Sequence, residues 1–336
     1  MKRAKIAFLW TYRKEALALV YLFFVGMAFG AIWIFHDRNS ENTLAFEEDH
    51  ETITVEIIQH KTPETSRRIP QNIPDDPVKT PMEQAWKRNA VKVAGHVTGK
   101  AQISIVIDDL GVVRDKTRSI INLPGPLTLS FLPYAKNLKT VTALARDRGH
   151  ELMIHLPMEP KSDKDPGPHA LRIGVSDQQM LKDLYFNLSQ FEGYVGLNNH
   201  MGSAFTENSA GLDLILTEVK KRGLLVLDSR TSRKSLLAKI ASEKNIPNMT
   251  RDFFLDNQQN VEYILGQLTK LENMAQKKGG AIAIGHPYSE TIEALSIWLP
   301  TLKDKGIVIV PLSHIIKRKY QKTLLARDRP ELSPAH

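Results

Sequence analysis

The sequence contains no cysteine, and this absence excludes several kinds of chemistry together. Disulfide bonds, thiolate zinc sites, iron–sulfur clusters and cysteine nucleophiles cannot occur. Any metal ion must therefore be held by histidine, aspartate or glutamate. The residues after position 100 also lack a run in which basic and aromatic side chains alternate, so a nucleic-acid-binding function is disfavoured despite a net charge of +8.

The composition is that of a globular chain. Hydrophobic residues make up 42% of the 336 residues and charged residues 24%, which excludes global disorder. At the usual size of about 100 to 200 residues per domain, the chain has room for one large domain with appendages or for two modest ones.

An apolar segment near the N-terminus is long enough to span a bilayer. Residues 16–35 form an uncharged run of 20 residues, which as a helix at about 1.5 Å per residue reaches about 30 Å. A cleaved signal peptide would have a shorter apolar centre and a small-residue cleavage site, whereas this run ends in Ile32-Trp33-Ile34-Phe35. We expect a retained transmembrane helix; a buried core helix is the alternative.

Charges on the two sides of this run predict its orientation. The charged residues of 1–15 are mainly basic, and those of 36–51 are mainly acidic. Because basic flanks stay in the cytoplasm, we expect the N-terminus there and everything after residue 36 outside. The expected location is the inner membrane of a bacterium, with the C-terminal domain in the periplasm.

Residues 36–100 differ in composition from the rest of the chain. They carry five prolines among many charges, and only residues 53–58 resemble a strand. This composition predicts an acidic, proline-containing linker between the membrane span and a folded domain over residues 101–316. We expect residues 317–336 to form a polar C-terminal tail.

Short β-branched runs alternate with helical ones after residue 101, which is typical of βα units around a parallel sheet. The sequence predicts an α/β fold, a distorted (β/α) barrel of seven or eight parallel strands. An open doubly wound sheet is the rival, but the first strand is followed by Asp108-Asp109-Leu110-Gly111 and not by a glycine-rich phosphate-binding turn. The predicted strands are 103–107, 127–132, 152–155, 194–197, 224–227, 249–254, 281–284 and 307–310.

The predicted helices and their ends are marked by capping residues. Ser176, Ser209 and Ser289 each precede a run with apolar side chains at helical spacing. Glycines are expected to end four helices just before the next strand. These glycines are Gly149, Gly223, Gly279 and Gly306.

Polar side chains follow most of the predicted strands at the point where each strand ends. The carboxyl ends of parallel strands converge on one face of a barrel, so these side chains are expected to meet. An unpaired buried charge is costly, which makes a site a better explanation than packing for the whole set. His150 precedes its strand and is expected to be structural. The set comprises Asp108, Asp109, His155, Glu159, Asn198, Asn199, His200, Asp228, Ser229, Arg230, His286 and His314.

Four ordered motifs resemble a known family. Ile107-Asp108-Asp109-Leu110-Gly111, His155 to Pro160, Asn198 to Ser203 and Gly285-His286-Pro287 are similar to the divergent branch of the NodB-type polysaccharide deacetylases. The resemblance covers about residues 101–316. It implies that Asp108 is the catalytic base, that Asp109 and His155 bind a divalent metal, usually zinc, and that His286 is the general acid.

One position departs from the family pattern. The second metal histidine of the family lies four residues after the first, and Glu159 occupies that position. We expect His200 to replace it, with Glu159 as the alternative ligand. The arginine–proline motif of the family is not evident either, and Arg230 is the candidate for orienting Asp108.

The chemistry expected of these residues is hydrolysis. A metal held by one carboxylate and two imidazoles keeps open positions for water and for a carbonyl oxygen. Asp108 would take the water proton, His286 would protonate the leaving amine, and Asp228 would hold His286 in its donating tautomer. A backbone N–H near Tyr134 is the candidate oxyanion donor. Asn198, Asn199 and Ser203 are the candidates for sugar contacts, although such asparagines also serve turns.

Three functions stay open on the sequence. The first is an anchored, metal-dependent deacetylase that removes N- or O-acetyl groups from an envelope or extracellular polysaccharide such as peptidoglycan. The second is an inactive barrel that binds glycan or an envelope protein, an alternative motivated by Glu159. The third is a metal hydrolase acting on another bond, such as a peptide amide or a phosphoester.

Overall fold

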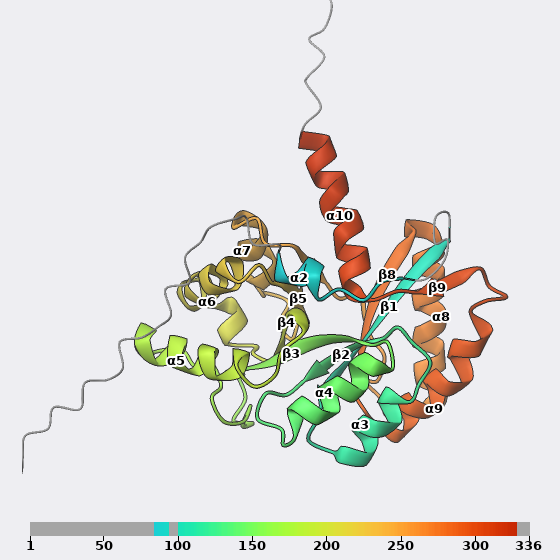
Figure 1. Cartoon of the computed structure of the whole chain (residues 1–336), viewed down its shortest axis with the longest axis horizontal. Coiled ribbons are helices and arrows are strands. Elements are labelled where there is room, and N and C mark those ends of the chain that lie inside the picture. The colour runs from blue at the N-terminus through green and yellow to red at the C-terminus, as the bar shows by residue number, and fades with distance from the viewer. Residues whose placement is uncertain (1–83, 94–99, 328–336) are drawn as a thin grey trace, which may run out of the picture. The chain divides into compact units, whose positions relative to one another are not determined.

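The computed structural model describes residues 84–93 and 100–327 (Figure 1). The predicted membrane span at 16–35 and the strand-like segment at 53–58 lie outside these residues. Among the helices that are described, none combines the length and the apolar character needed to cross a bilayer.

A curled sheet of nine strands forms the centre of the fold, and all of its pairings are parallel. The prediction of a parallel, barrel-like α/β fold is confirmed in this form. The strands are β1 (Ala101–Leu110), β2 (Thr128–Phe131), β3 (Glu151–Met158), β4 (Tyr194–Met201), β5 (Leu225–Asp228), β6 (Asn248–Thr250), β7 (Phe253–Phe254), β8 (Gly280–Gly285) and β9 (Ile307–Ile309).

The strand order explains why the sheet curls. The path runs β6-β5-β4-β3-β2-β1-β8-β7, so its two ends are β6 and β7, which are neighbours in the sequence. The predicted single strand at 249–254 is in fact these two short strands, because the chain pairs with β5 as far as Thr250 and with β8 from Phe253. Strand β9 pairs only with β1, at Ala101–Ile103, and therefore does not stand between β8 and β1.

Helices cover the outside of the sheet, with α3, α4, α8 and α9 on one side of Figure 1 and α5, α6 and α7 on the other. The predicted helices after Ser176, Ser209 and Ser289 are all present, although the capping residues of the last two are Asn208 and Tyr288. The helices are α2 (Ala85–Arg88), α3 (Arg114–Ile121), α4 (Leu138–Asp147), α5 (Asp177–Leu188), α6 (Ser209–Lys221), α7 (Leu237–Glu243), α8 (Val261–Lys278), α9 (Ser289–Trp298) and α10 (Leu312–Arg327), with 3-10 turns at Phe205–Glu207 and Leu299–Thr301.

Alternation along the strands separates two apolar clusters. On β1, Ile103, Ile105 and Ile107 pack outward under the helices, whereas Val106 faces the interior. The interior cluster collects one or two residues from most strands and excludes water from the half of the curled sheet where the strands begin, near α2 and α10; this is called the lower half below. Its members from the sheet include Val106, Met153, Val195, Leu225, Leu227, Ile282 and Ile284.

Two segments close the lower end of the sheet, and one of them, α2, lies outside the predicted domain borders. Trp86 of α2 is 1% exposed and packs into the interior cluster, and its backbone N–H donates to the Gly223 carbonyl at 3.0 Å. Ile315 and Ile316 of α10 join the same cluster. The folded unit therefore includes residues 84–93, which the sequence assigned to the linker, and α10 takes up about half of the predicted tail.

A buried carboxylate holds the start of α10. Glu151 is fully buried at the first residue of β3, and Oε1 accepts a hydrogen bond from the backbone N–H of Ser313 at 3.0 Å. The Ser313 hydroxyl donates to Oε2. Burial raises the pKa of Glu151, and the bonds from Ser313 and Thr128 oppose that rise. The first-turn N–H groups of a helix favour such an acceptor.

His150 confirms the structural role predicted for it. It is fully buried at the lower end of β3, where Nδ1 accepts from the Leu127 N–H at 3.2 Å and Nε2 donates to the Ile121 carbonyl at 3.0 Å. Burial lowers the pKa of this imidazole. Both ring nitrogens are engaged with the backbone, so none is left for a ligand.

We expect Trp86→Ala to lower the free energy of unfolding of the full-length chain by about 3 to 5 kcal/mol, because it empties a large apolar site at the lower end of the sheet. Urea denaturation followed by circular dichroism measures the change. Arg88→Ala, which alters an exposed side chain of the same helix, is the matched control and should stay within about 0.5 kcal/mol of the parent. Equal effects of the two substitutions would contradict a closing role for α2.

Candidate active site

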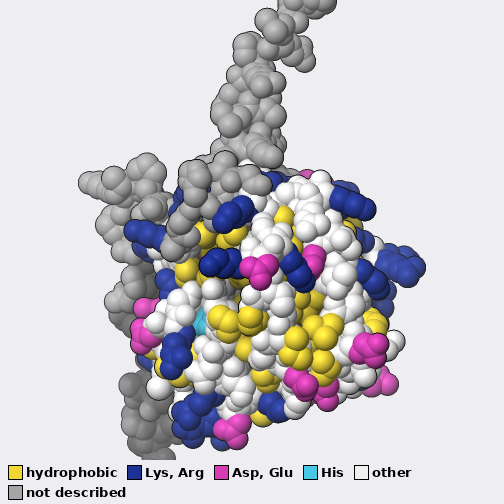
Figure 2. Space-filling model, turned by 90° about the vertical axis from the view of Figure 1, so that its right-hand side faces the viewer, with side chains coloured by type: hydrophobic (Ala, Val, Ile, Leu, Met, Phe, Trp, Pro, Cys, Tyr) yellow, Lys and Arg dark blue, Asp and Glu magenta, His cyan; other side chains and the backbone are white. Residues whose placement is uncertain are grey.

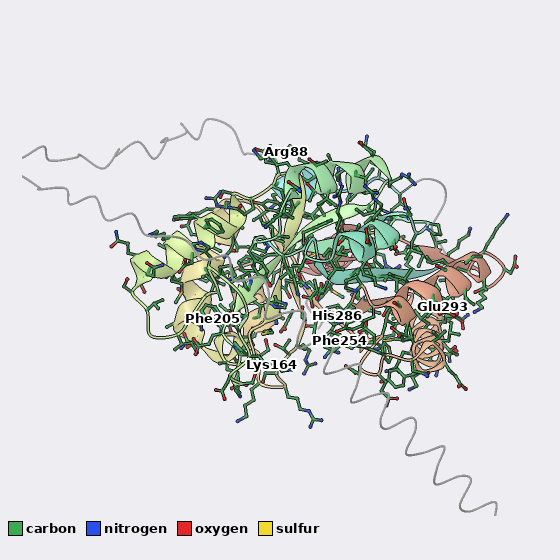
Figure 3. The ribbon with its side chains drawn as sticks, turned by 90° about the horizontal axis from the view of Figure 1, so that it is seen from below. Arg88, Lys164, Phe205, Phe254, His286 and Glu293 are labelled. Carbon is green, nitrogen blue, oxygen red and sulfur yellow. The ribbon has the colours of Figure 1, made fainter. Side chains whose placement is uncertain are left out.

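The polar side chains predicted from the strand ends gather at the end of the sheet opposite to α2. In Figure 3, Arg88 of α2 lies on the far side of the molecule from His286 and from Lys164, in the segment after β3. Asp108, His155 and Asn198 are each at most 2% exposed and project inward from β1, β3 and β4. His286 follows β8, two residues after the interior residue Ile284.

An irregularity in β1 lets two consecutive aspartates serve one site. Successive side chains of a regular strand point to opposite faces, so Asp108 and Asp109 would normally diverge. The register of β1 against β2 shifts between Ile107 and Leu110, and Asp109 has a φ of 57°. This left-handed conformation is uncommon for a residue other than glycine. It turns the Asp109 carboxylate toward the histidines of β3 and β4.

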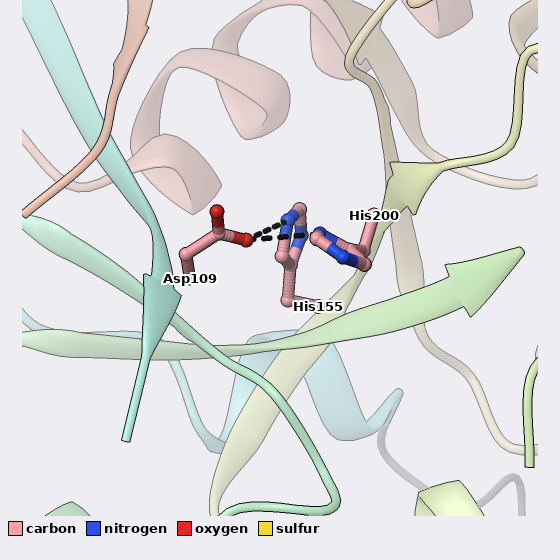
Figure 4. A group of neighbouring side chains, drawn as sticks. All are labelled: Asp109, His155 and His200. Atoms are coloured by element: carbon pink, nitrogen blue, oxygen red, sulfur yellow. Dashed lines mark ion pairs between the residues drawn. The ribbon is translucent and has the colours of Figure 1, made fainter. Parts of the chain in front are cut away.

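Asp109, His155 and His200 form a compact cluster (Figure 4). Asp109 Oδ1 lies 3.2 Å from His155 Nε2 and 2.9 Å from His200 Nδ1. One ligand atom from each of the three residues lies within 4.8 Å of the others. The two imidazoles meet edge to face, with ring centroids 4.8 Å apart. The three residues expected to share a metal are thus brought together.

The donor set of this cluster fits a divalent metal such as zinc. One carboxylate and two imidazoles are a ligand set that zinc enzymes use, and three protein ligands leave positions open for reactants. Asp109 Oδ1 is buried and makes no hydrogen bond of regular geometry, although both imidazoles are at ion-pair distance. Burial acts to raise the pKa of Asp109, but the close polar contacts and the charges of His155 and His200 outweigh it and hold the pKa far below its usual range.

Asp108 lies next to this cluster, on the side of His155. Its Oδ2 is 3.6 Å from His155 Nε2, and both carboxylate oxygens accept from Asn198 Nδ2, at 2.9 and 3.0 Å. Burial raises the pKa of Asp108, and the charges of His155 and His286 oppose the rise. A buried carboxylate that lies next to the cluster without belonging to its possible ligand set is suited to accept a proton.

His286 follows β8, which pairs with β1 on the side away from β3 and β4, and a carboxylate lies behind its imidazole. Its Nδ1 donates to Asp256 Oδ1 at 2.9 Å, so Nε2 is the nitrogen left for a reactant. Burial opposes the charge on His286, but the hydrogen bond and charge of Asp256, supported by Asp108 and Asp109, raise its pKa to about 9. The rings of Phe254 and Tyr288 flank the imidazole, with centroids 6.0 and 5.5 Å away.

The expectation that Asp228 orients His286 is wrong. Asp228 accepts from the Arg230 N–H at 2.7 Å and from the Ser235 hydroxyl at 2.8 Å. Leu225 and Leu227 face the interior, so by alternation Asp228 points the other way, toward the loop before α7. Its carboxylate stabilises that loop.

Two asparagines expected to contact sugar are buried. Asn198 is 0% and Asn199 1% exposed, and neither reaches a substrate from there. Asn199 accepts from the Ser229 N–H at 2.9 Å and donates to Thr231 Oγ1 and to the Met201 carbonyl. It serves the turn, which was the alternative interpretation.

The other candidates for substrate contact fall into two groups. Ser203 accepts from the Lys161 N–H at 2.9 Å, and Arg230 has an exposed side chain in the loop after β5, where its backbone N–H donates to Asp228. Tyr134, by contrast, stays a candidate. Burial together with the charges of Asp109 and Asp165 raises its pKa to about 12.

Glu159 is not a ligand in this arrangement. Its Oε2 accepts from the Ile173 N–H at 2.6 Å, so the carboxylate fastens the segment that follows β3. His200, two residues beyond the inward-facing Asn198 on β4, occupies the place near Asp109 instead. His314 lies in α10 at the lower end of the sheet and is not part of the site.

Two functional residues are missing from the set predicted on the sequence. Asp256 comes two residues after β7, which ends at Phe254 like the predicted strand, so a search for polar residues just past that strand end would have found it. Arg251 donates to the carbonyls of Ser229 and Arg230 and stacks on Phe254 at 3.7 Å, and the charge of Asp108 acts on its guanidinium.

The sequence model of one protein family, described as divergent polysaccharide deacetylase, matches residues 105–316. The chain belongs to this family. The matched residues extend from β1 to α10 and include the whole of the candidate site. The resemblance seen in the four motifs is thereby confirmed.

Related proteins span most of the same domain. An uncharacterized protein of Haemophilus influenzae is 31% identical over 205 residues, which cover 61% of this chain and 73% of that protein. The uncharacterized protein YibQ of Escherichia coli is 30% identical over 215 residues, covering 64% and 67% of the two chains. The crystal structure of an uncharacterized protein, Atu2773 of Agrobacterium tumefaciens C58, has 29% identity and a TM-score of 0.67, and covers 69% of this chain and 95% of that one.

We expect the purified chain to bind one zinc ion, and His200→Ala to weaken that binding by about 100-fold or more, because one of three ligands is removed. Competition with a chromophoric chelator measures the affinity. Glu159→Ala is the matched control, since it removes a carboxylate that faces Ile173, and it should change the affinity less than about threefold. The opposite ranking would make Glu159 the ligand.

Proposed function

We propose that this protein is a metal-dependent carbohydrate deacetylase that removes N- or O-acetyl groups from an envelope or extracellular polysaccharide. The observation that carries the proposal is the convergence of Asp109, His155 and His200 on one point, with Asp108 on one side and His286 on the other. Membership of the divergent polysaccharide deacetylases supports the substrate class.

The residues divide the work of hydrolysis by position. A divalent ion held by Asp109, His155 and His200 would supply Lewis acidity for the acetyl carbonyl and for the attacking water. Asp108, an acceptor beside the cluster, takes the water proton. His286, whose pKa is held at about 9 by Asp256, carries the proton that the leaving nitrogen or oxygen needs. Asp256 keeps that proton on Nε2 by accepting from Nδ1.

The inactive barrel is the alternative function. It was motivated by Glu159, where the family has a histidine. His200 lies at the cluster in place of that histidine. Three possible metal ligands, Asp109, His155 and His200, are therefore available for catalysis. Release of acetate from acetylated chito-oligosaccharide or from peptidoglycan fragments decides between the two functions.

We also propose that the domain works outside the cytoplasm, anchored in the inner membrane by residues 16–35. The basic flank before that run and the acidic flank after it support this orientation. A periplasm-dependent reporter fused after residue 60 should be active, and cytoplasmic activity of the fusion would reverse the orientation.

Figure 2 shows one face of the domain on which basic and acidic side chains are interspersed, with no continuous basic strip of the kind that binds nucleic acid.

Asp108→Asn should retain zinc and lose acetate release by a factor of about 100 to 10,000, because the substitution removes a base and leaves all three ligands in place. Zinc content and acetate release are measured on the same preparation. Asp115→Asn, at an exposed position of α3, is the control and should match the parent in both. Full turnover by Asp108→Asn would reject its role as the base.

Activity should depend on pH through His286. The general acid works in its charged form, so the rate is maintained below the pKa of His286 and falls as pH rises through about 9. Asp256→Asn removes the main charge that raises this pKa and should move the alkaline limb down by about 1 to 3 pH units. Asp108, Asp109 and Tyr288 also face the imidazole and are unchanged in this variant.

The matched control for this shift is Asp252→Asn, in the same segment. The Asp252 carboxylate accepts from the Ile282 N–H at 2.9 Å and makes no contact with His286. It should leave the alkaline limb where it is in the parent. A limb that stays at the same pH in Asp256→Asn would show that another group carries the proton.

A further inference from the structure

Asn198 is a fully buried side chain whose hydrogen-bonding capacity is used completely. Its Oδ1 accepts from the Ser130 hydroxyl at 2.6 Å and faces His155 Nδ1 at 3.0 Å. Its Nδ2 donates to both oxygens of Asp108, at 2.9 and 3.0 Å, and to Ser229 Oγ at 3.0 Å. An amide has two lone pairs and two hydrogens to satisfy, and all four directions are filled here.

The placement of Asn198 follows from the sheet. Strands β3 and β4 pair with His155 directly opposite Asn198, so the two side chains are neighbours across the ladder. Asn198 and His200 lie two residues apart on β4 and share its inward side. Asn198 therefore lies one layer below the cluster, in contact with the base and with one ligand and out of reach of a substrate.

The partners decide which way round the amide lies. A charged carboxylate accepts hydrogen bonds and donates none, so the NH2 group must face Asp108. The carbonyl then faces His155 Nδ1, which must carry a hydrogen to bond with it. A neutral imidazole with hydrogen on Nδ1 has its lone pair on Nε2, the nitrogen that lies 3.2 Å from Asp109 Oδ1.

We propose that Asn198 is a positioning residue that uses the two ends of one amide for two tasks. Its carbonyl fixes the tautomer of His155 that can bind a cation through Nε2, and its NH2 group orients the carboxylate of Asp108 as the base. The inference rests on the proposed function for the second task only. The first task concerns metal binding and does not require turnover.

The substitution Asn198→Asp separates the two tasks. A carboxylate of the same shape still accepts from His155 Nδ1 and Ser130, so zinc affinity should stay within about threefold of the parent or rise. Its other oxygen would face Asp108, and two carboxylates cannot share that space without repulsion or a trapped proton. Acetate release should therefore fall by about 100-fold or more in kcat, with KM unchanged because Asn198 does not touch substrate.

The substitution Asn198→Ala removes both ends of the amide. It should weaken zinc binding by about 10- to 100-fold, because the hydrogen-bond acceptor behind a ligating histidine is lost, and it should lower kcat as well. Both variants are compared as full-length chains, with zinc affinity by chelator competition and with thermal unfolding as the check on folding. The difference in zinc affinity between the two variants is the measurement that a merely structural role would not produce.

Asn199→Asp is the matched control. Asn199 is buried next to Asn198, and its Nδ2 faces a backbone carbonyl and Thr231 and no part of the site. A buried negative charge is introduced in both variants, so any loss of stability should be similar, but kcat per folded, zinc-loaded molecule should fall only in Asn198→Asp.

Equal loss of zinc affinity in Asn198→Asp and Asn198→Ala would overturn the tautomer assignment. Full kcat in Asn198→Asp would overturn the orientation of the base. If the parent releases no acetate, the proposed function fails, while the zinc affinities still decide the first task.

Discussion

The interior of the curled sheet must accommodate charged side chains in a place that excludes water. A buried ionised group is tolerated only when hydrogen bonds or an opposite charge compensate for the lost hydration. Asp108 and His155 are almost completely buried, and each finds its compensation in Asn198 and in the other. Asp109 finds it in two imidazoles. The arrangement of the site is the solution to this constraint.

The same interior is divided into two layers with different tasks. Its lower half is apolar and is closed by Trp86 and by the first turns of α10, which Glu151 holds in place. This layer supplies the rigid base on which the polar layer stands. Figure 1 shows the remainder of α10 leaving the body of the domain, so only its first turns contribute to this closure.

The sequence predicted those site residues that can be found from the order of strands along the chain. The strand-end rule located Asp108, Asp109, His155, His200 and His286, because parallel strands bring their carboxyl ends together whatever the details of the sheet. It failed where the direction of a side chain mattered. Asp228 follows a strand as expected but points outward, and Asp256 holds His286 because β7, which it follows, pairs with β8. Trp86 was missed because its short helix lies among prolines and charges.

The sequence by itself determined the class of fold, the family and the chemical types gathered at one end of the strands, since these depend on hydrophobic periodicity and on which residues end each strand. Only the tertiary structure decided which carboxylate pairs with which imidazole, that His200 and not Glu159 faces Asp109, and that Asn198 is buried between base and ligand. The physical reason is that a hydrogen bond depends on direction as well as on proximity. A local irregularity such as the left-handed Asp109 redirects a side chain without leaving a trace in the pattern of residues.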